Sequence, residues 1–283
     1  MDIIFILKAF FIAVVEGITE FIPVSSTGHM ILAGWAIGFN GDFVKMYEVV
    51  IQLGAILAVV VLFWHKIKTS IIEFFKFIFT FGREGKTGFK FGINVIVSSI
   101  PIGIMGLLFY KRIKAKFVPE AVIVGFIAGG LLLLIVESMF RKKKSKTQNI
   151  DDISFVQSLT VGLLQVLALW PGMSRSASTI MGGWIAGFTT PLAAEYSFFI
   201  AIPAMIGTTG KDLLEFDFSI MTPTLWISLI TGFIVAFLVS MIVMKKFISF
   251  LKKKPMKVFA VYRVCAGILL AVLVLTHIIK LTA

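Results

Sequence analysis

The sequence predicts an all-α polytopic membrane protein with an inverted-topology repeat, in which each half is a broken, re-entrant helical hairpin followed by three transmembrane helices. Three observations lead to this prediction. The 283 residues are 58% hydrophobic, with a mean hydropathy of +1.00, whereas a soluble domain is typically about 45–50% apolar. Only 15% of the residues are charged, and they cluster between long apolar runs. Two of these runs are interrupted by short polar segments that resemble each other.

Six apolar segments are long enough to cross the hydrocarbon core of a bilayer, which takes about 20 helical residues. They lie near residues 48–65, 88–110, 117–140, 190–210, 223–244 and 258–281. We interpret the charged clusters between them as loops. Residues 1–21 have no basic start, and Glu16 and Glu20 interrupt their apolar run, so we expect this segment to be retained rather than cleaved as a signal peptide.

Two further apolar stretches, near residues 2–40 and 154–188, are each cut by a polar segment that contains Pro and Gly. These segments read PVSSTGH at residues 23–29 and PGMSRSAST at residues 171–179. Each stretch predicts a helix, a break and a second helix. The second halves align without gaps, which pairs Ser25 with Ser174, and the first halves pair Glu20 with Gln165 at an offset shorter by four residues.

Each broken stretch is followed by three spans. Because three is an odd number, the second copy must enter the membrane from the opposite side, as in the inverted repeats that bring broken helices to the bilayer midplane. We expect one membrane domain, residues 1–283, with repeat 1 at about 1–140 and repeat 2 at about 154–283, joined by a basic loop at 141–153.

The net charge of +12 would suggest a nucleic-acid partner in a soluble protein. Here the basic residues flank the spans, so the positive-inside rule explains them and no nucleic-acid partner is expected. Three basic segments, 66–90, 141–146 and 245–257, fall on one side of the membrane, which puts the termini and the start of the first hairpin outside. The acidic segment 211–217 agrees with this orientation, and the basic segment 111–116 disagrees.

Glu16 and Glu20 are the first candidate site residues. An ionisable group inside an apolar helix costs about 2.5–3.5 kcal/mol on insertion scales, and these two, four residues apart, project from the same helix face. Two carboxylates so close repel each other, whereas a hard divalent cation such as magnesium would satisfy both and contact phosphate oxygens. The alternative is that both are ordinary polar residues in a wet interfacial layer.

The first break combines hydroxyls, a glycine and an imidazole, which is the composition of a nucleophile with a base. Its candidate residues are Ser25, Ser26, Thr27 and His29. The alternative is a helix cap, for which one hydroxyl would suffice. The other two histidines, His65 and His277, lie at span ends and are interpreted as interfacial residues. The lone cysteine, Cys265, excludes an internal disulfide and a cysteine-based zinc cluster.

The second break carries an arginine among hydroxyls, at Ser174, Arg175, Ser176, Ser178 and Thr179. A helix that restarts here points its free N–H groups at the cluster, and arginine suits bidentate contact with phosphate, so this break predicts a phosphoanion receptor. The alternative is a structural arginine paired with Glu16 or Glu20. Gln165 fits either a hydrogen bond in the same cavity or packing between helices. Glu48 and Glu195 are weaker candidates, at interfacial positions or behind the site.

EGITEFIPVSSTGH at residues 16–29, together with PGMSRSAST, resembles the undecaprenyl-diphosphate phosphatase, or bacitracin-resistance, family. The likeness continues through YEVVIQLGAILAVV at 47–60 and EYSFFIAIPAM at 195–205. It implies a bacterial inner-membrane enzyme that converts undecaprenyl diphosphate to undecaprenyl phosphate and recycles the lipid carrier of cell-wall precursors. It also implies an active site facing outside and a divalent cation as cofactor, magnesium or else calcium. Bacitracin would be a partner only indirectly, through the shared lipid.

Matched residue by residue, the resemblance implies catalytic roles for Glu16, Glu20, Ser26, His29 and Arg175. The implied phosphate-binding residues are Ser25, Thr27, Ser174, Ser176 and Thr179, and the implied metal ligands are Glu16 and Glu20. The family usually reads S-R-S-G-x-T, whereas Ala177 stands here in the glycine position, which puts a positive φ there in doubt. The type-2 phosphatidic-acid phosphatases are disfavoured because no histidine follows Arg175 before His277.

The expected mechanism has Ser26 as nucleophile and His29 as proton shuttle, with His29 itself or a metal-bound water as alternative nucleophiles. The rival function is a transporter or flippase of a lipid phosphate, since broken helices in inverted repeats are typical of secondary carriers. The surplus of catalytic groups favours the phosphatase. The expected partners are a polyprenyl diphosphate and membrane lipids, and the sequence leaves a homo-oligomer open.

Overall fold

The computed structural model describes residues 2–141, 147–251 and 253–277, and these residues form helices and short connections without any strand. Within this part of the chain, six helices are long and apolar enough to cross a membrane. They are α3 (Asp42–Leu62), α5 (Lys86–Leu108), α7 (Pro119–Phe140), α10 (Thr190–Glu215), α11 (Pro223–Leu251) and α12 (Lys257–Leu275). They coincide with the six predicted spans, so the prediction of a polytopic all-α membrane protein is confirmed.

Two pairs of shorter helices occupy the two interrupted stretches. In the first, α1 (Ile3–Thr19) leads through a break into α2 (Ser26–Ile37). In the second, α8 (Phe155–Gln165) continues as a 3-10 turn, η2 (Val166–Leu169), before the break and α9 (Arg175–Ile185). α8 begins with a capping box between Ser154 and Gln157, which satisfies two backbone N–H groups and explains where this helix starts.

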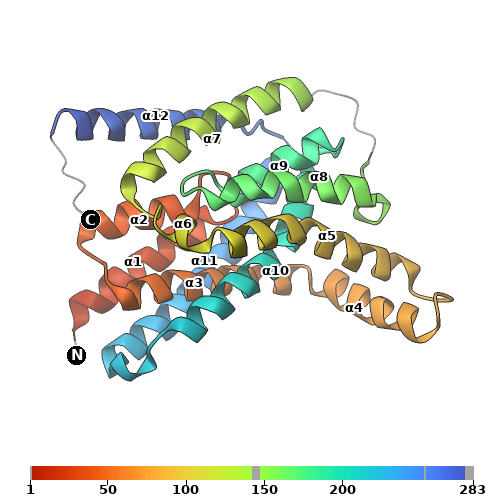
Figure 1. Cartoon of the computed structure of the whole chain (residues 1–283), viewed down its shortest axis with the longest axis horizontal. Helices are drawn as coiled ribbons and strands as arrows, with labels where there is room; N and C mark the ends of the chain where they lie inside the picture. Colours follow the sequence, from red (N-terminus) through yellow and green to blue (C-terminus); the bar gives the residue numbers. More distant parts are fainter. Residues whose placement is uncertain (1, 142–146, 252, 278–283) are drawn as a thin grey trace.

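The two hairpins lie at opposite ends of the bundle. In Figure 1, α2 lies toward the left end and α8 starts at the right end, with the breaks between them. α1 packs against α11 as α8 packs against α5, and α7 packs against α12. These are the contacts that two halves related by a pseudo-two-fold axis would make. The inverted repeat and its boundaries stay a prediction.

The hydrophobic core places the first break against α10. One cluster of buried residues surrounds α9 and α10, and the other joins α1, α3 and α11. Phe21, which directly follows Glu20, meets Phe198 of α10 edge to face, with ring centroids 5.5 Å apart. This contact fixes the polar residues of the first break beside those of the second.

The interpretation of every charged cluster as a loop is wrong in part. Most of segment 66–90 is helical, because α4 (Trp64–Phe79) fills its first half and α5 begins at Lys86. The cluster at 111–116 contains the short helix α6 (Tyr110–Lys114), α10 continues to Glu215, and α11 continues to Leu251. α4 carries apolar residues at helical spacing, and it packs against α5.

The charged segments still separate by end of the bundle. In Figure 1, α4 lies at the right, and α6 lies at the left. The connection at 141–153 contains a 3-10 turn, η1 (Ile150–Asp152), and its basic residues at 142–146 lie outside the described residues. A second 3-10 turn, η3 (Phe218–Ile220), joins α10 to α11.

Candidate active site

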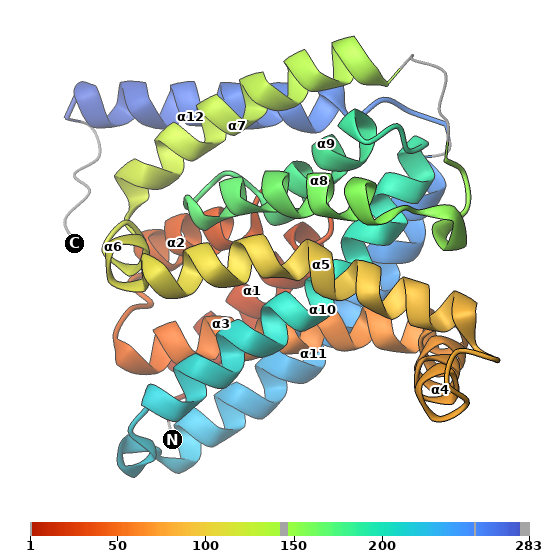
Figure 2. The same cartoon turned by 45° about the vertical axis from the view of Figure 1, so that its right-hand side comes forward.

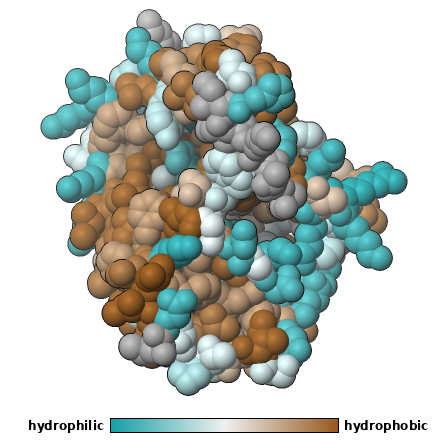
Figure 3. Space-filling view, turned by 90° about the vertical axis from the view of Figure 1, so that its left-hand side faces the viewer, coloured by the Kyte–Doolittle hydropathy of each residue, from teal (hydrophilic) through white to brown (hydrophobic). Residues whose placement is uncertain are grey.

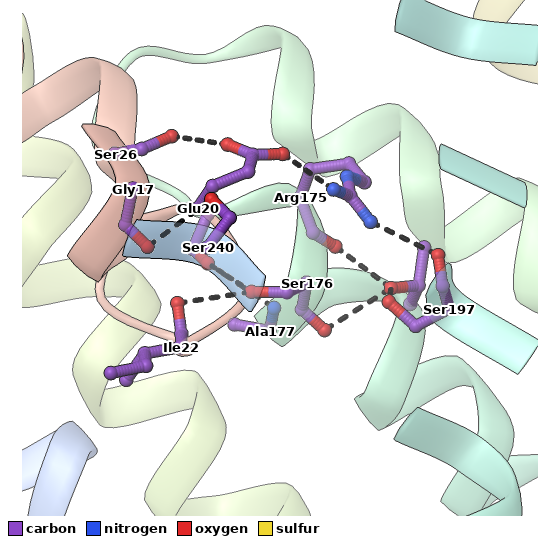
Figure 4. A network of polar contacts seen from close by, with 11 residues as sticks. Gly17, Glu20, Ile22, Ser26, Arg175, Ser176, Ala177, Ser197 and Ser240 are labelled. Carbon is purple, nitrogen blue, oxygen red and sulfur yellow. Dashed lines mark hydrogen bonds and ion pairs between the residues drawn. The ribbon is translucent and has the colours of Figure 1, made fainter. Parts of the chain in front are cut away.

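The carboxylate of Glu20 joins the two breaks. Its Oε2 accepts a hydrogen bond from the Ser26 hydroxyl at 2.5 Å, and its Oε1 accepts one from Nη2 of Arg175 at 2.5 Å (Figure 4). The Glu20 and Arg175 side chains are only 4% and 9% exposed, and they lie 155 residues apart in the chain. A hydroxyl, a carboxylate and a guanidinium from the two predicted motifs therefore form one buried chain of contacts.

Matching backbone turns position Ser26 and Arg175. Ser25 and Ser174 precede α2 and α9 with φ of 74° and 70°, values that cost a residue with a Cβ roughly 1–3 kcal/mol. Each serine hydroxyl caps its helix, accepting from the N–H of Gly28 at 3.3 Å or of Ala177 at 3.2 Å. Both helices thus start within the polar cluster, where N–H groups of their first turns have no intrahelical partner.

Besides Glu20, a residue of α10 contacts the guanidinium of Arg175. Its Nη1 donates to the carbonyl of Ser197 at 3.0 Å, while its Nε contacts no acceptor within the described chain. The hydroxyls of Thr179 and Ser197 are 2.6 Å apart, and the Ser176 hydroxyl donates to the carbonyl of Ile22 at 3.2 Å (Figure 4). α9 is therefore fixed both to α10 and to the first break.

Glu16 is fully buried, and neither of its carboxylate oxygens contacts a hydrogen-bond donor among the described residues. It interacts electrostatically with Glu20 and Glu48. A buried carboxylate without donors is costly, so this arrangement calls for a cation or a proton. The oxygens of Glu16, Glu20 and Ser26 are hard donors of the kind that magnesium and calcium prefer. The described residues contain no group of three or more His, Cys, Asp or Glu suited to a metal.

His29 faces α12 rather than Ser26. Its Nδ1 lies 2.8 Å from the Ser25 carbonyl oxygen, and its Nε2 lies 2.8 Å from the hydroxyl of Tyr262. The rings of His29 and Tyr262 stack with their centroids 5.8 Å apart. The ring of Phe126, on α7, also packs against the imidazole. The Ser26 hydroxyl thus contacts the carboxylate of Glu20, whereas the sequence predicted His29 as its partner.

Two of the weaker candidates lie apart from the Glu20 cluster. The amide of Gln165 donates to the Ser98 carbonyl at 3.2 Å, so it contacts α5. Glu195, near the start of α10 and two residues before Ser197, interacts instead with Lys66 and Asp151. Glu48, by contrast, lies close to Glu16.

The remaining candidates lie on the two helices that follow the breaks. Thr27 occupies the first turn of α2, and the Ser174 hydroxyl lies 3.1 Å from that of Ser176. The Ser178 hydroxyl donates to the Ser174 carbonyl at 2.9 Å. Ala177, in the glycine position of the motif, lies inside α9 and does not have a positive φ. The positive φ of this motif is at Ser174, so the backbone accommodates alanine at 177.

Arg263 of α12 is the residue that the sequence analysis missed. Its side chain is fully buried, and its Nη2 donates to the carbonyls of Gly125, Gly172 and Met173 at 3.0, 2.8 and 3.0 Å. Its Nη1 reaches the Pro23 carbonyl at 3.5 Å, so one arginine contacts both breaks. An arginine inside an apolar span was a visible signal, because such residues are expensive and suggest function.

The chain matches the family model of bacitracin resistance protein BacA over residues 9–269. A protein of Clostridioides difficile (strain 630) named undecaprenyl-diphosphatase 2 is 68% identical over 280 residues, which cover 99% of both chains. Proteins named undecaprenyl-diphosphatase from Clostridium perfringens (strain 13 / Type A) and Clostridium tetani (strain Massachusetts / E88) are 58% and 50% identical. These two alignments cover 99% and 98% of this chain and 99% of each relative.

Proposed function

The chain belongs to the bacitracin resistance protein BacA family, and we propose that it is a membrane phosphatase that hydrolyses undecaprenyl diphosphate to undecaprenyl phosphate and inorganic phosphate. The observation that carries this proposal is the contact of one carboxylate, Glu20, with both the Ser26 hydroxyl and the Arg175 guanidinium. A hydroxyl paired with a base and placed next to an anion-binding arginine is the arrangement that phosphoryl transfer requires.

Ser26 is the proposed nucleophile and Glu20 its base. As Oγ of Ser26 bonds to the terminal phosphorus, its proton passes to Glu20, whose oxygen is already in hydrogen-bonding contact. The bond between that phosphorus and the bridging oxygen breaks, and undecaprenyl phosphate leaves. Water then attacks the phosphoserine, which releases inorganic phosphate and restores the hydroxyl of Ser26.

Arg175 and the starts of α2 and α9 are proposed to bind the phosphates. The free Nε of Arg175 and the N–H groups of both first helical turns converge on the cluster, and helix N-termini favour anions. The contact of Ser197 with Nη1 keeps the guanidinium oriented while Glu20 exchanges partners. The hydroxyls of Ser174, Ser176 and Thr179 support this geometry from α9.

We propose a divalent cation, expected to be magnesium, as cofactor. Glu16 and Glu20 would hold it, since the two donor-free oxygens of Glu16 fit a hard cation. When bound, such an ion withdraws charge from a phosphoryl group. Because the two carboxylates are few ligands for such an ion, the remaining ligands would be water and phosphate oxygens.

The protein is proposed to lie in the bacterial plasma membrane with its active site facing outside. The basic helix α4 lies at the right end of the bundle in Figure 1, and basic segments favour the cytoplasmic side. Figure 3 looks onto the opposite end, where hydrophilic residues lie among hydrophobic ones. Bacitracin would act on this protein only through the shared lipid. The division into repeats at about 1–140 and 154–283 is proposed for the same domain.

The test is phosphate release from undecaprenyl diphosphate by the purified full chain in detergent, with magnesium and with a chelator. Glu20→Gln and Arg175→Ala should each lose release. The matched controls are Glu84→Gln, an exposed carboxylate in the connection between α4 and α5, and Arg112→Ala, an exposed arginine of α6, and both should retain it. A folded protein that binds the lipid but releases no phosphate would contradict the phosphatase and favour a lipid-phosphate transporter.

A further inference from the structure

The exposed side of helix α4 is both apolar and basic. It is not among the candidate membrane spans, yet Phe79 and Phe81 at its end are 76% and 96% exposed, and Trp64, Ile72 and Phe75 are at least half exposed. Figure 2 views α4 nearly along its axis while α3 and α5 run across the picture, so α4 turns away from the bundle direction. A short helix with these properties lies in the surface layer of a bilayer.

A cavity of about 280 Å3 lies between α4, α5 and α10. Its walls are apolar, and Ser70 is the one side chain with a polar group among the residues that line it. Phe91 and Phe199 in its wall are buried, whereas Ile71 and Ile96 are about half exposed, so the cavity leads from the lipid-facing surface into the protein. Its size, at the small end of the roughly 300–1,000 Å3 of ligand pockets, suits a single hydrocarbon chain rather than a whole lipid.

Basic residues lie beside this cavity and along the connection that follows α4. The ammonium of Lys66 lies 5.1 Å from the ring centroid of Phe91, although Lys66 also pairs with Asp151. Within the described chain, no carboxylate lies within ion-pair distance of three exposed basic residues of α4 and its connection to α5, namely Lys68, Arg83 and Lys86. Lys68 precedes the cavity residue Ile71 by one helical turn. An apolar slot whose two lining helices, α4 and α5, and their connection carry unpaired cations is complementary to a lipid with an anionic headgroup.

We propose that the cavity binds one acyl chain of an anionic phospholipid, whose headgroup lies against the basic residues of α4 and the α4–α5 connection. Each such residue near an anionic membrane surface adds to the attraction. The site is separate from the Glu20 cluster, so phospholipid binding and phosphate release can be lost independently.

The test is native mass spectrometry of the delipidated full chain with equal amounts of phosphatidylglycerol and phosphatidylcholine that carry the same acyl chains. One phosphatidylglycerol should stay bound at collision energies that remove phosphatidylcholine. Val95→Phe, which fills the cavity, and Ile96→Trp, which obstructs its opening, should each reduce phosphatidylglycerol retention at least tenfold. The triple change Lys68→Gln, Arg83→Gln and Lys86→Gln should abolish the preference for phosphatidylglycerol.

The controls are Ile104→Phe, on the exposed face of α5 outside the cavity, and the triple change Lys111→Gln, Arg112→Gln and Lys116→Gln at the other end of the bundle. Both should bind phosphatidylglycerol as the unchanged protein does, and phosphate release reports that each variant is folded. Equal retention of the two phospholipids, or undiminished retention by both cavity variants, would overturn the proposal. Displacement of phosphatidylglycerol by undecaprenyl phosphate, one for one, would assign the cavity to the isoprenoid chain instead.

Discussion

Replacement of Arg263 by methionine should destabilise the protein and the active site together. Arg263 is the fully buried cation that contacts both breaks, and methionine fills much of its volume without any donor. The carbonyls of Gly125, Gly172 and Met173 would lose their partner in an apolar environment. Because Ser26 and Arg175 are positioned by these same breaks, we expect lower phosphate release as well as lower stability.

The magnitude follows from the contacts. Nη2 carries two hydrogens and meets three carbonyls at 2.8–3.0 Å, so it makes the equivalent of two hydrogen bonds, and the 3.5 Å contact to Pro23 adds little. A hydrogen bond to a charged group contributes about 1.5–3 kcal/mol, so the loss should be about 3–6 kcal/mol in the free energy of unfolding. Arg263→Lys should lose less, because an ammonium still donates, although without the planar fork of arginine.

The assay is unfolding in detergent, followed by tryptophan fluorescence, with phosphate release measured on the same samples. Gly129→Ala provides an independent perturbation, because a Cβ there would lie 2.0 Å from Nη2 of Arg263 and would displace it. Its matched control is Gly103→Ala, where a Cβ would meet no atom within 4 Å. A wild-type unfolding midpoint and wild-type release in both Arg263→Met and Gly129→Ala would refute this account of the two breaks.

Three further predictions concern the chemistry. Ser26→Ala should abolish phosphate release, and near-normal release would return the role of nucleophile to water or His29. Tyr262→Phe removes one hydrogen bond to His29, which contributes about 0.5–1.5 kcal/mol. We therefore expect kcat to fall about two- to twelve-fold while the dependence of kcat on pH stays unchanged. A shifted pH dependence would give His29 a role in proton transfer. Glu16→Gln should abolish the rise in unfolding temperature that magnesium produces by binding the folded state, and an undiminished rise would place the cation elsewhere.

The sequence was sufficient to predict the spans and the central contacts. Six apolar runs of membrane-crossing length became six long helices, and the polar segments in the other two runs became breaks. One interpretation of the sequence paired Arg175 with Glu16 or Glu20. The structure contains this ion pair, with Glu20 as the partner. These features were predictable because each depends on local composition, and because charges buried in apolar segments require partners.

The remaining features depend on contacts between distant segments, which spacing alone does not reveal. Arg263 meets carbonyls that precede it by 90, 91, 138 and 240 residues, and a carbonyl carries no sequence signal of its need for a donor. His29 looked like the base of Ser26 because it is three residues away, yet its ring turns toward Tyr262, 233 residues further on. The charges of segment 66–90 predict a loop, whereas the helical spacing of its apolar residues corresponds to the observed helix α4.

The long separation between Glu20 and Arg175 has a consequence for biosynthesis. A ribosome adds about 5–20 residues per second, so the 155 residues between them take roughly 8–31 s to make. During that interval the first hairpin has two carboxylates and no arginine partner, and it cannot settle in its final place in the hydrocarbon without neutralising them. Arg263 is made later still. The N-terminal hairpin should therefore be inserted early and reach its final position late, after α9 and α12 have left the ribosome.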